Sequence, residues 1–187
     1  MKTDLSNVTL LIADPRPQNK DKCRNLLNHV SSNVTFGGVK HLYEFEEGKE
    51  AYDRLLSIEL SNWFDTDFVM VCQLDGWMTN PELWTNDYFN YDYIGAPWPY
   101  WLNRNRVGNG GFSLRSKKLH VFLETQRWEW LPDDVFISNA CGRVIVENGM
   151  KFAPLEVAAK FSFESPIKEE HLIPKQTLGF HGGRFFE

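Results

Sequence analysis

Asp75 lies at a position where a ligand site is expected, provided that the residues before it form a strand. Residues 68–72 (Phe-Val-Met-Val-Cys) are a continuous apolar run, and Asp75 follows it with Gly76 directly behind. A glycine lets the backbone turn sharply, so the carboxylate is exposed at the end of the strand. There it can coordinate a hard cation that holds a diphosphate. The alternative is an aspartate that only forms the turn, which is common at such positions.

Two adjacent carboxylates, Asp133 and Asp134, come directly after Pro132. Residues 132–142 have the pattern of a helix, and the positive N-terminal end of a helix stabilises acidic side chains in its first turn. The pair can therefore be purely structural. The functional alternative is a general base that removes the proton from an acceptor hydroxyl.

Glycines mark two further segments. Residues 106–115 read Arg-Val-Gly-Asn-Gly-Gly-Phe-Ser-Leu-Arg and enter a strand-like stretch, where glycine is otherwise unfavourable. So many glycines let backbone amides approach a ligand, although the Gly-Lys-Ser or Gly-Lys-Thr ending of a phosphate loop is absent. His181 lies between glycines near the C-terminus. A lone histidine is more often structural, but one in a glycine-rich tail can move onto a metal ion or a phosphate.

The elements that would position these residues alternate between strands and helices. Apolar runs at 8–13 and 68–72 predict buried strands, and β-branched and aromatic residues at 34–43 predict another strand. Apolar residues at helical spacing predict helices at 21–30 and 50–64. This alternation favours an α/β fold with a mainly parallel central sheet and helices on both faces.

In a mainly parallel sheet, ligands bind at the carboxyl ends of the strands. Two loops qualify here, the one after Ala13 and the one after Cys72. Residues 93–96 and 110–114 supply later strands. No internal repeat or linker divides the sequence, so we expect a single domain over residues 1–187.

Composition restricts the class of protein. The chain has 187 residues and a net charge of −5 without a basic stripe, which argues against a nucleic-acid partner. No apolar run reaches the length of a membrane span, and the first one is too short for a signal peptide. The 3 cysteines lack metal spacing and indicate buried thiols in a reducing compartment. We therefore expect a cytoplasmic protein without a membrane span.

Aromatic residues are frequent, at 14% of the chain with 7 Trp. Several lie among polar residues, as Trp98 and Trp101 do. Flat apolar rings beside polar groups suit the C–H faces of sugars. The alternative for any one of them is a contact in the core or between subunits.

Taken together, these segments resemble a family of glycosyltransferase-like proteins of uncharacterised function. The resemblance extends from about residue 51 to residue 182, and the order and combination of the segments are specific although no single one is. The segments that carry it are 52–56 (Tyr-Asp-Arg-Leu-Leu), 71–77 (Val-Cys-Gln-Leu-Asp-Gly-Trp), 91–99 (Tyr-Asp-Tyr-Ile-Gly-Ala-Pro-Trp-Pro), 107–115, 133–136 (Asp-Asp-Val-Phe), 161–165 (Phe-Ser-Phe-Glu-Ser) and 179–181 (Gly-Phe-His).

The resemblance implies the GT-A fold, in which a Rossmann-like nucleotide half and an acceptor half share one continuous sheet. Such enzymes move a sugar from a nucleotide-sugar, here expected to be UDP- or GDP-linked, to a glycan or other hydroxyl acceptor. They usually carry an Asp-x-Asp motif that holds Mn²⁺ or Mg²⁺ against the donor diphosphate. The corresponding residues here are Gln73-Leu74-Asp75, so only Asp75 matches a metal ligand. His181 resembles the C-terminal histidine that completes the metal shell in several such enzymes.

The resemblance also implies roles for two pairs of residues. Asp133 and Asp134 resemble the acidic pair of many inverting members, in which the second acid is the base, so Asp134 is the candidate and Asp133 its neighbour. Tyr52 and Arg54 are similar to a segment that contacts the nucleotide in related galactosyltransferases. Arg54 would add positive charge near the diphosphate.

Position in the predicted fold assigns the remaining site residues as hypotheses. Asp14 and Arg16, after the first strand, would face the nucleobase and the ribose. The sugar or acceptor site would be lined by Asn109, Gly110 and Gly111 and by an aromatic wall of Trp77, Trp98 and Trp101.

Two alternatives stay open. A retaining transferase on the same fold would use Asp134 to steady the acceptor or a developing oxocarbenium ion. A catalytically silent carbohydrate-binding or scaffold module would agree with the missing first aspartate of the motif. The donor sugar, the acceptor and the oligomeric state are open as well.

Overall fold

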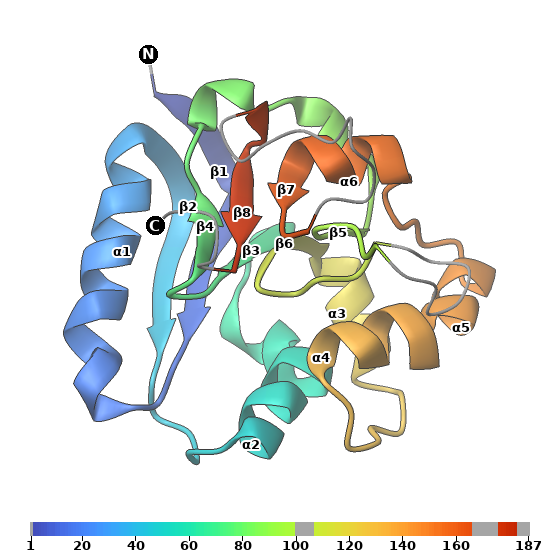
Figure 1. Ribbon diagram of the computed structural model, residues 1–187. Coiled ribbons are helices and arrows are strands. Elements are labelled where there is room, and N and C mark those ends of the chain that lie inside the picture. The colour runs from blue at the N-terminus through green and yellow to red at the C-terminus, as the bar shows by residue number, and fades with distance from the viewer. Residues whose placement is uncertain (1, 100–106, 166–175, 183–187) are drawn as a thin grey trace.

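Five strands form the central sheet of the computed structural model, which describes residues 2–99, 107–165 and 176–182 (Figure 1). In sheet order the strands are β2 (Val34–Leu42), β1 (Thr3–Ala13), β3 (Phe68–Cys72), β6 (Phe112–Ser116) and β5 (Tyr93–Ile94). β1 is parallel to β2 and β3, whereas β6 is antiparallel to both β3 and β5, so four of the five strands run in one direction. The predicted α/β fold with a mainly parallel sheet is confirmed.

The central strands are covered on both faces, because consecutive residues of a strand point to opposite sides. Ile12 packs in one apolar cluster with side chains of α1 (Lys20–Asn33). Leu11, its neighbour, packs in a second cluster with the helical stretch at 49–63. The continuous apolar run at 8–13 therefore belongs to a strand that is buried on both faces, as is usual in parallel sheets.

The helical stretch at 49–63 is irregular. It begins as α2 (Lys49–Arg54), widens into a π-helical turn at Leu55–Glu59 and ends in a 3-10 turn at Leu60–Trp63. The predicted helix is therefore present but is not one regular helix. The backbone carbonyl of Leu56, inside the π-helical turn, accepts a hydrogen bond of 3.2 Å from Arg115 Nη1.

A second sheet of three short strands lies beside the central one (Figure 1). Its strands, in order, are β4 (Gly76–Met78), β8 (Gly179–His181) and β7 (Ser162–Phe163). β4 and β8 are antiparallel, with Gly76 opposite His181. The interpretation of His181 as part of a glycine-rich tail is therefore wrong, because backbone pairing holds this residue in a strand beside the turn that carries Asp75.

Shorter elements complete the fold. The predicted helix at 132–142 is also irregular, since a π-helical turn at Phe136–Ala140 follows α4 (Asp133–Val135). The acidic pair lies at the start of α4. The remaining helices are α3 (Lys117–Leu123), α5 (Gly142–Glu147) and α6 (Leu155–Phe161), and further 3-10 turns lie at Pro17–Asn19, Pro81–Leu83 and Asn86–Asn90.

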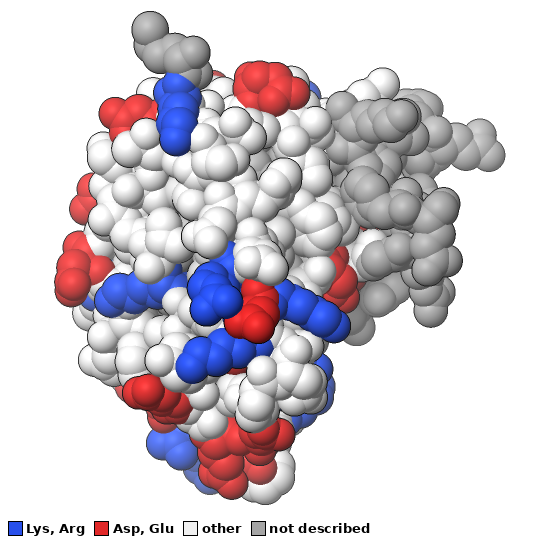
Figure 2. Space-filling view, turned by 90° about the vertical axis from the view of Figure 1, so that its left-hand side faces the viewer, with Lys and Arg blue, Asp and Glu red and all other residues white. Residues whose placement is uncertain are grey.

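Three expectations from composition can be compared with the structure. Figure 2 shows Lys and Arg interspersed with Asp and Glu on the face over α1, without a continuous basic area. No helix in the described ranges is long and apolar enough to span a membrane. The three cysteines, Cys23, Cys72 and Cys141, are free and buried, as predicted.

Candidate active site

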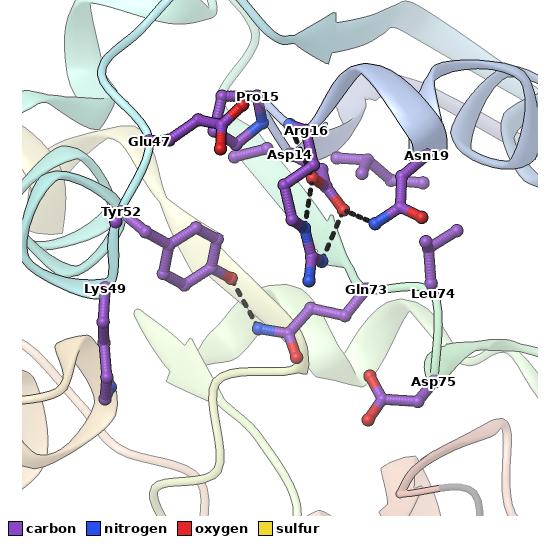
Figure 3. Close-up of a pocket in the computed structure, with 13 residues that line it drawn as sticks. Asp14, Pro15, Arg16, Asn19, Glu47, Lys49, Tyr52, Gln73, Leu74 and Asp75 are labelled. Carbon is purple, nitrogen blue, oxygen red and sulfur yellow. Dashed lines mark hydrogen bonds and ion pairs between the residues drawn. The ribbon is translucent and has the colours of Figure 1, made fainter.

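A pocket of about 750 Å³ opens at the carboxyl ends of β1 and β3 (Figure 3). Both loops that the sequence places at this edge, after Ala13 and after Cys72, contribute to its wall. Its volume is typical of sites that bind small molecules. The residues that line it are Ile12, Ala13, Asp14, Pro15, Arg16, Asn19, Glu47, Gly48, Lys49, Tyr52, Gln73, Leu74 and Asp75.

Asp14 and Arg16 form a rigid unit on the side of β1. The Asp14 carboxylate accepts hydrogen bonds from Arg16 Nε at 2.8 Å, Arg16 Nη2 at 2.7 Å, the Arg16 backbone N at 3.0 Å and Asn19 Nδ2 at 2.9 Å. Burial raises the pKa of Asp14, but these bonds outweigh it and leave the pKa below its usual value. The carboxylate is thus occupied within the protein. Both residues line the pocket, and the Arg16 side chain, 55% exposed against 5% for Asp14, is the more accessible of the two.

Tyr52 and Gln73 join the two sides of the pocket (Figure 3). Gln73 Nε2 donates a hydrogen bond of 2.5 Å to the Tyr52 hydroxyl oxygen. Burial raises the pKa of Tyr52 well above its usual value, so the hydroxyl keeps its hydrogen at neutral pH. The bond fixes the Gln73 amide across the end of β3.

The family resemblance implied that Arg54 adds positive charge near the diphosphate, but Arg54 does not line the pocket. Its Nε pairs with Glu59 Oε1 at 2.8 Å on the surface. The reason is helical geometry: residues two apart on a helix point about 200° apart. Since Tyr52 faces the pocket, Arg54 faces away from it.

Asp75 and His181 meet at the end of the pocket nearest β4. Asp75 Oδ1 lies 3.7 Å from His181 Nε2, and Gln73 Oε1 lies 3.1 Å from the same nitrogen. The other ring nitrogen, Nδ1, lies 3.2 Å from Glu164 Oε1. Burial lowers the pKa of His181, but the hydrogen bond to Glu164 and the charge of Asp75 raise it, and the net result is a raised pKa.

These donors match what a divalent cation such as Mn²⁺ accepts. Asp75 offers a carboxylate oxygen and His181 a ring nitrogen whose partner nitrogen faces a carboxylate, the usual arrangement of a metal-binding histidine. Within the described residues, no group of three or more His, Cys, Asp or Glu side chains is arranged to hold a metal ion. Cations at phosphate sites often have only one or two carboxylate ligands from the protein, because phosphate and water supply the others. The residues therefore fit a cation that a diphosphate also binds.

The two central glycines of the glycine-rich segment are required by close packing. A Cβ atom at Gly111 would lie 2.0 Å from the His181 ring, and one at Gly110 would lie 2.8 Å from Asp133 Oδ2. Their amides bond to side chains of the site: Gly111 N donates to Asn109 Oδ1 at 2.9 Å, and Gly110 N donates to Asp134 Oδ2 at 3.4 Å. The segment thus brings the histidine and the acidic pair against one stretch of backbone.

Asp133 is the buried member of the acidic pair. Its Oδ2 lies 2.6 Å from Nη2 of Arg115, which is fully buried. Arg115 also donates to Gly110 O at 3.2 Å and to Ser113 Oγ at 2.9 Å, and its guanidinium lies 5.4 Å from the centre of the Tyr93 ring. Both charges of this pair are compensated inside the protein, whereas no such ion pair of Asp134 is found in the part of the chain that the structure describes.

Asp134 lies beside the glycine segment and has a perturbed acidity. Its carboxylate accepts hydrogen bonds from Val135 N at 2.8 Å and Gly110 N at 3.4 Å. Burial and the neighbouring Asp133 charge raise its pKa to about 6. A carboxyl group whose pKa is close to neutrality is well suited to accept a proton at neutral pH.

The structure does not support an exposed aromatic wall. Trp98 is only 6% exposed, because its indole lies directly against Gly108, where a Cβ atom would come within 2.3 Å of the ring. This part of the prediction is wrong. The Trp77 ring packs against Phe180 at a centroid distance of 4.5 Å, and Trp101 lies outside the described residues.

Residues 33–181 match the family model described as "Protein of unknown function (DUF5672)". The chain belongs to this family. Among solved structures, it is similar to a glycosyltransferase involved in the glycosylation of the major capsid of PBCV-1, with a TM-score of 0.57 and 14% identity over 93% of this chain and 91% of that chain. It is also similar to the galactosyltransferase LgtC in complex with donor and acceptor sugar analogues, with a TM-score of 0.48 and 9% identity over 92% of this chain and 86% of that chain. No curated protein matches the chain.

The first of these similarities shows that this DUF5672 member has a glycosyltransferase fold of the GT-A type. In that fold, the site described above occupies the strand ends where both sheets meet. The resemblance that the sequence segments carry is therefore supported at the level of the fold.

Two site residues of this family member were missed by sequence reasoning. Glu164 follows β7 and contacts both His181 and Asn109, while Arg115 lies under the glycine segment. Both belong to segments that carry the family resemblance, but neither has a local pattern that reveals its partners. A buried arginine looks like a surface arginine in sequence, and the Glu164 contacts join positions 17 and 55 residues away.

Proposed function

We propose that the chain is a glycosyltransferase that moves a sugar from a UDP- or GDP-linked donor to a glycan or other hydroxyl acceptor. The observation that carries this proposal is the pocket at the ends of β1 and β3, with Asp75 and His181 beside it, on a GT-A fold. The whole chain, residues 1–187, would form one catalytic domain, acting in the cytoplasm.

The donor would occupy the pocket. Arg16 and Tyr52, which line it, would contact the nucleobase and ribose, with Asp14 holding Arg16 in place. Asp75 and His181 would hold Mn²⁺ or Mg²⁺ against the diphosphate. When bound, such a cation supplies a positive charge that stabilises the leaving diphosphate.

The acceptor would bind beside the glycine segment. Asn109, Gly110 and Gly111 lie between His181 and Asp134, which is where the anomeric carbon of a bound donor would face the acceptor. Asp134 would take the proton of the acceptor hydroxyl while the hydroxyl oxygen attacks the anomeric carbon. The bond to the diphosphate breaks with its electron pair on the leaving oxygen, and the configuration is inverted.

The experiment that tests this function is turnover of a panel of UDP- and GDP-sugars with Mn²⁺, followed by NMR. Release of the nucleoside diphosphate from one donor supports a transferase, and transfer to an added acceptor gives the anomeric configuration of the product. An inverted configuration supports Asp134 as base, whereas retention assigns it to the alternative mechanism. If no donor of the panel is consumed, the chain is better described as a silent carbohydrate-binding or scaffold module.

A further inference from the structure

We propose that Glu164 is a positioning residue that sets the tautomer of His181 and the orientation of Asn109 at the same time. This inference rests on the proposed function, because it concerns how the residues around the donor diphosphate are held. It adds a residue that neither the sequence motifs nor the similarity of fold assigns to the site.

The geometry of Glu164 carries the proposal. One of its oxygens, Oε1, accepts a hydrogen bond of 2.7 Å from Asn109 Nδ2 and lies 3.2 Å from His181 Nδ1. Its side chain is 25% exposed and Asn109 is buried. Asn109 continues the connection, since its Oδ1 accepts from Gly111 N at 2.9 Å. A single carboxylate oxygen therefore joins the histidine of β8 to the glycine segment.

The contact fixes which ring nitrogen of His181 carries hydrogen. A carboxylate oxygen can only accept, so the bond to Glu164 requires the hydrogen on Nδ1. In the neutral ring the lone pair is then on Nε2, which lies 3.1 Å from the Gln73 side-chain amide and 3.7 Å from Asp75 Oδ1. The Gln73 amide can turn over, so that its N–H donates to this lone pair and its oxygen accepts from the Tyr52 hydroxyl, whereas the Glu164 carboxylate can only accept. A cation needs that lone pair, and carboxylate partners on the other nitrogen are what usually orient metal-binding histidines.

Backbone pairing holds the fold of this region independently of the Glu164 side chain. A positioning role of Glu164 can therefore be distinguished from a role in folding. β7 and β8 are already paired through their backbones, with Ser162 opposite Gly179 and Phe163 opposite Phe180. β8 is also paired with β4 on its other side. The Glu164 carboxylate is therefore not needed to keep His181 in its strand, and its bonds act on the direction and the tautomer of the side chains.

Three variants test the proposal. Glu164→Ala removes the acceptor, Glu164→Gln keeps an acceptor oxygen, and Glu156→Ala removes an exposed glutamate on the neighbouring helix α6 as the matched control. The first readout is the tautomer of His181, measured by long-range ¹H–¹⁵N correlation of ¹⁵N-labelled histidine above the pKa of this residue. A His181→Gln spectrum identifies its signals.

We expect hydrogen on Nδ1 in the wild type, in Glu164→Gln and in Glu156→Ala, and on Nε2, or a mixture of the two neutral tautomers, in Glu164→Ala. A wild-type His181 with its hydrogen on Nε2, or an unchanged tautomer in Glu164→Ala, overturns the proposal. This readout needs no donor, so it remains decisive even if the proposed transferase activity is not found.

The second readout is Mn²⁺ affinity in the presence of UDP or GDP, by calorimetry. Loss of a carboxylate behind a metal-binding histidine typically weakens metal affinity about 10–100-fold. We expect a loss of this size in Glu164→Ala, a smaller one in Glu164→Gln and none in Glu156→Ala. If the wild type binds no nucleotide, the proposed function fails. The tautomer measurement alone then decides whether Glu164 is a positioning residue. If it binds but Glu164→Ala binds Mn²⁺ equally well, the positioning role is refuted.

Discussion

At the scale of single residues, two neighbouring aspartates differ sharply in their surroundings. Asp133 is neutralised by the buried Arg115, whereas Asp134, among the described residues, accepts hydrogen bonds from backbone amides and has a pKa raised to about 6. We predict that Asp134→Asn lowers the turnover of the proposed transferase about 10²–10⁴-fold, because a general base typically contributes that much. Nucleotide binding, measured by calorimetry, should be nearly unchanged.

In the wild type, turnover should fall as the pH decreases through about 6, as the base becomes protonated.

The same contrast predicts opposite effects on stability, and these can be measured without a substrate. The pKa of Asp134 is raised in the folded protein, so the fold binds its proton more tightly than the unfolded chain does. The stability that the protonated Asp134 carboxyl contributes to the fold is therefore lost as the pH rises through about 6. Asp134→Asn should raise Tm at pH 7.5 relative to the wild type, and the gain should shrink at pH 4.

Asp133→Asn is the matched comparison for that measurement. It leaves the fully buried Arg115 without its carboxylate partner, and breaking a buried pair in this way costs about 3–5 kcal/mol. Its Tm should be lower than that of the wild type at pH 7.5. A Tm for Asp134→Asn below that of Asp133→Asn would contradict the assignment of the structural role to Asp133.

At the scale of elements, the glycine segment and β8 must approach each other closely. Gly111→Ala would bring a Cβ atom to 2.0 Å from the His181 ring, which cannot move away without disturbing β8. Gly149→Ala serves as the control: its φ of +75° makes any side chain unfavourable, but nothing lies within 4 Å. The control should lose about 1–2 kcal/mol, the usual cost of that conformation. Gly111→Ala should lose more in urea unfolding, and equal losses would refute the close contact.

Helix α3 carries a histidine that makes the fold sensitive to acid. Both ring nitrogens of His120 are buried without a hydrogen-bond partner among the described residues. Burial, together with the charges of Arg115 and Lys117, lowers its pKa well below the usual value. The unfolded chain therefore binds this proton more readily, and stability is lost as the pH falls below about 6.5. When the pH is lowered from 7.5 to 5, the Tm of His120→Leu should fall by less than the Tm of the wild type. An equal fall in both proteins would contradict this explanation.

Strands β1 and β3 were predictable because both have apolar residues on both faces, and the loops after Ala13 and Cys72 could be placed from that pattern alone. His181 was not predictable as a strand residue. The sequence Gly-Phe-His-Gly has no strand pattern, and its partner strand β4 is about 100 residues earlier in the chain. Trp98 was misjudged because burial against a glycine backbone leaves no trace in the spacing of aromatic residues.

At the scale of the whole molecule, the candidate site depends on two sheets. The central sheet supplies the pocket, while the small sheet supplies His181 and, just after β7, Glu164 (Figure 1). The hydrogen bonds from Tyr52 through Gln73, His181 and Glu164 to Asn109 cross between them. This network connects the pocket to the glycine segment beside Asp134.

The central claim is that this pocket binds a nucleoside diphosphate together with a divalent cation. The most direct test is a thermal-shift titration of the wild type and Asp75→Asn with UDP and GDP, each with and without Mn²⁺. A ligand at about 100 times its Kd stabilises the fold by about 2.7 kcal/mol, which is readily measured. We predict that Mn²⁺ increases the nucleotide-induced shift in the wild type and that Asp75→Asn keeps its fold but loses this increase. No nucleotide-induced shift in the wild type, or an equal Mn²⁺-dependent shift in Asp75→Asn, would contradict the claim.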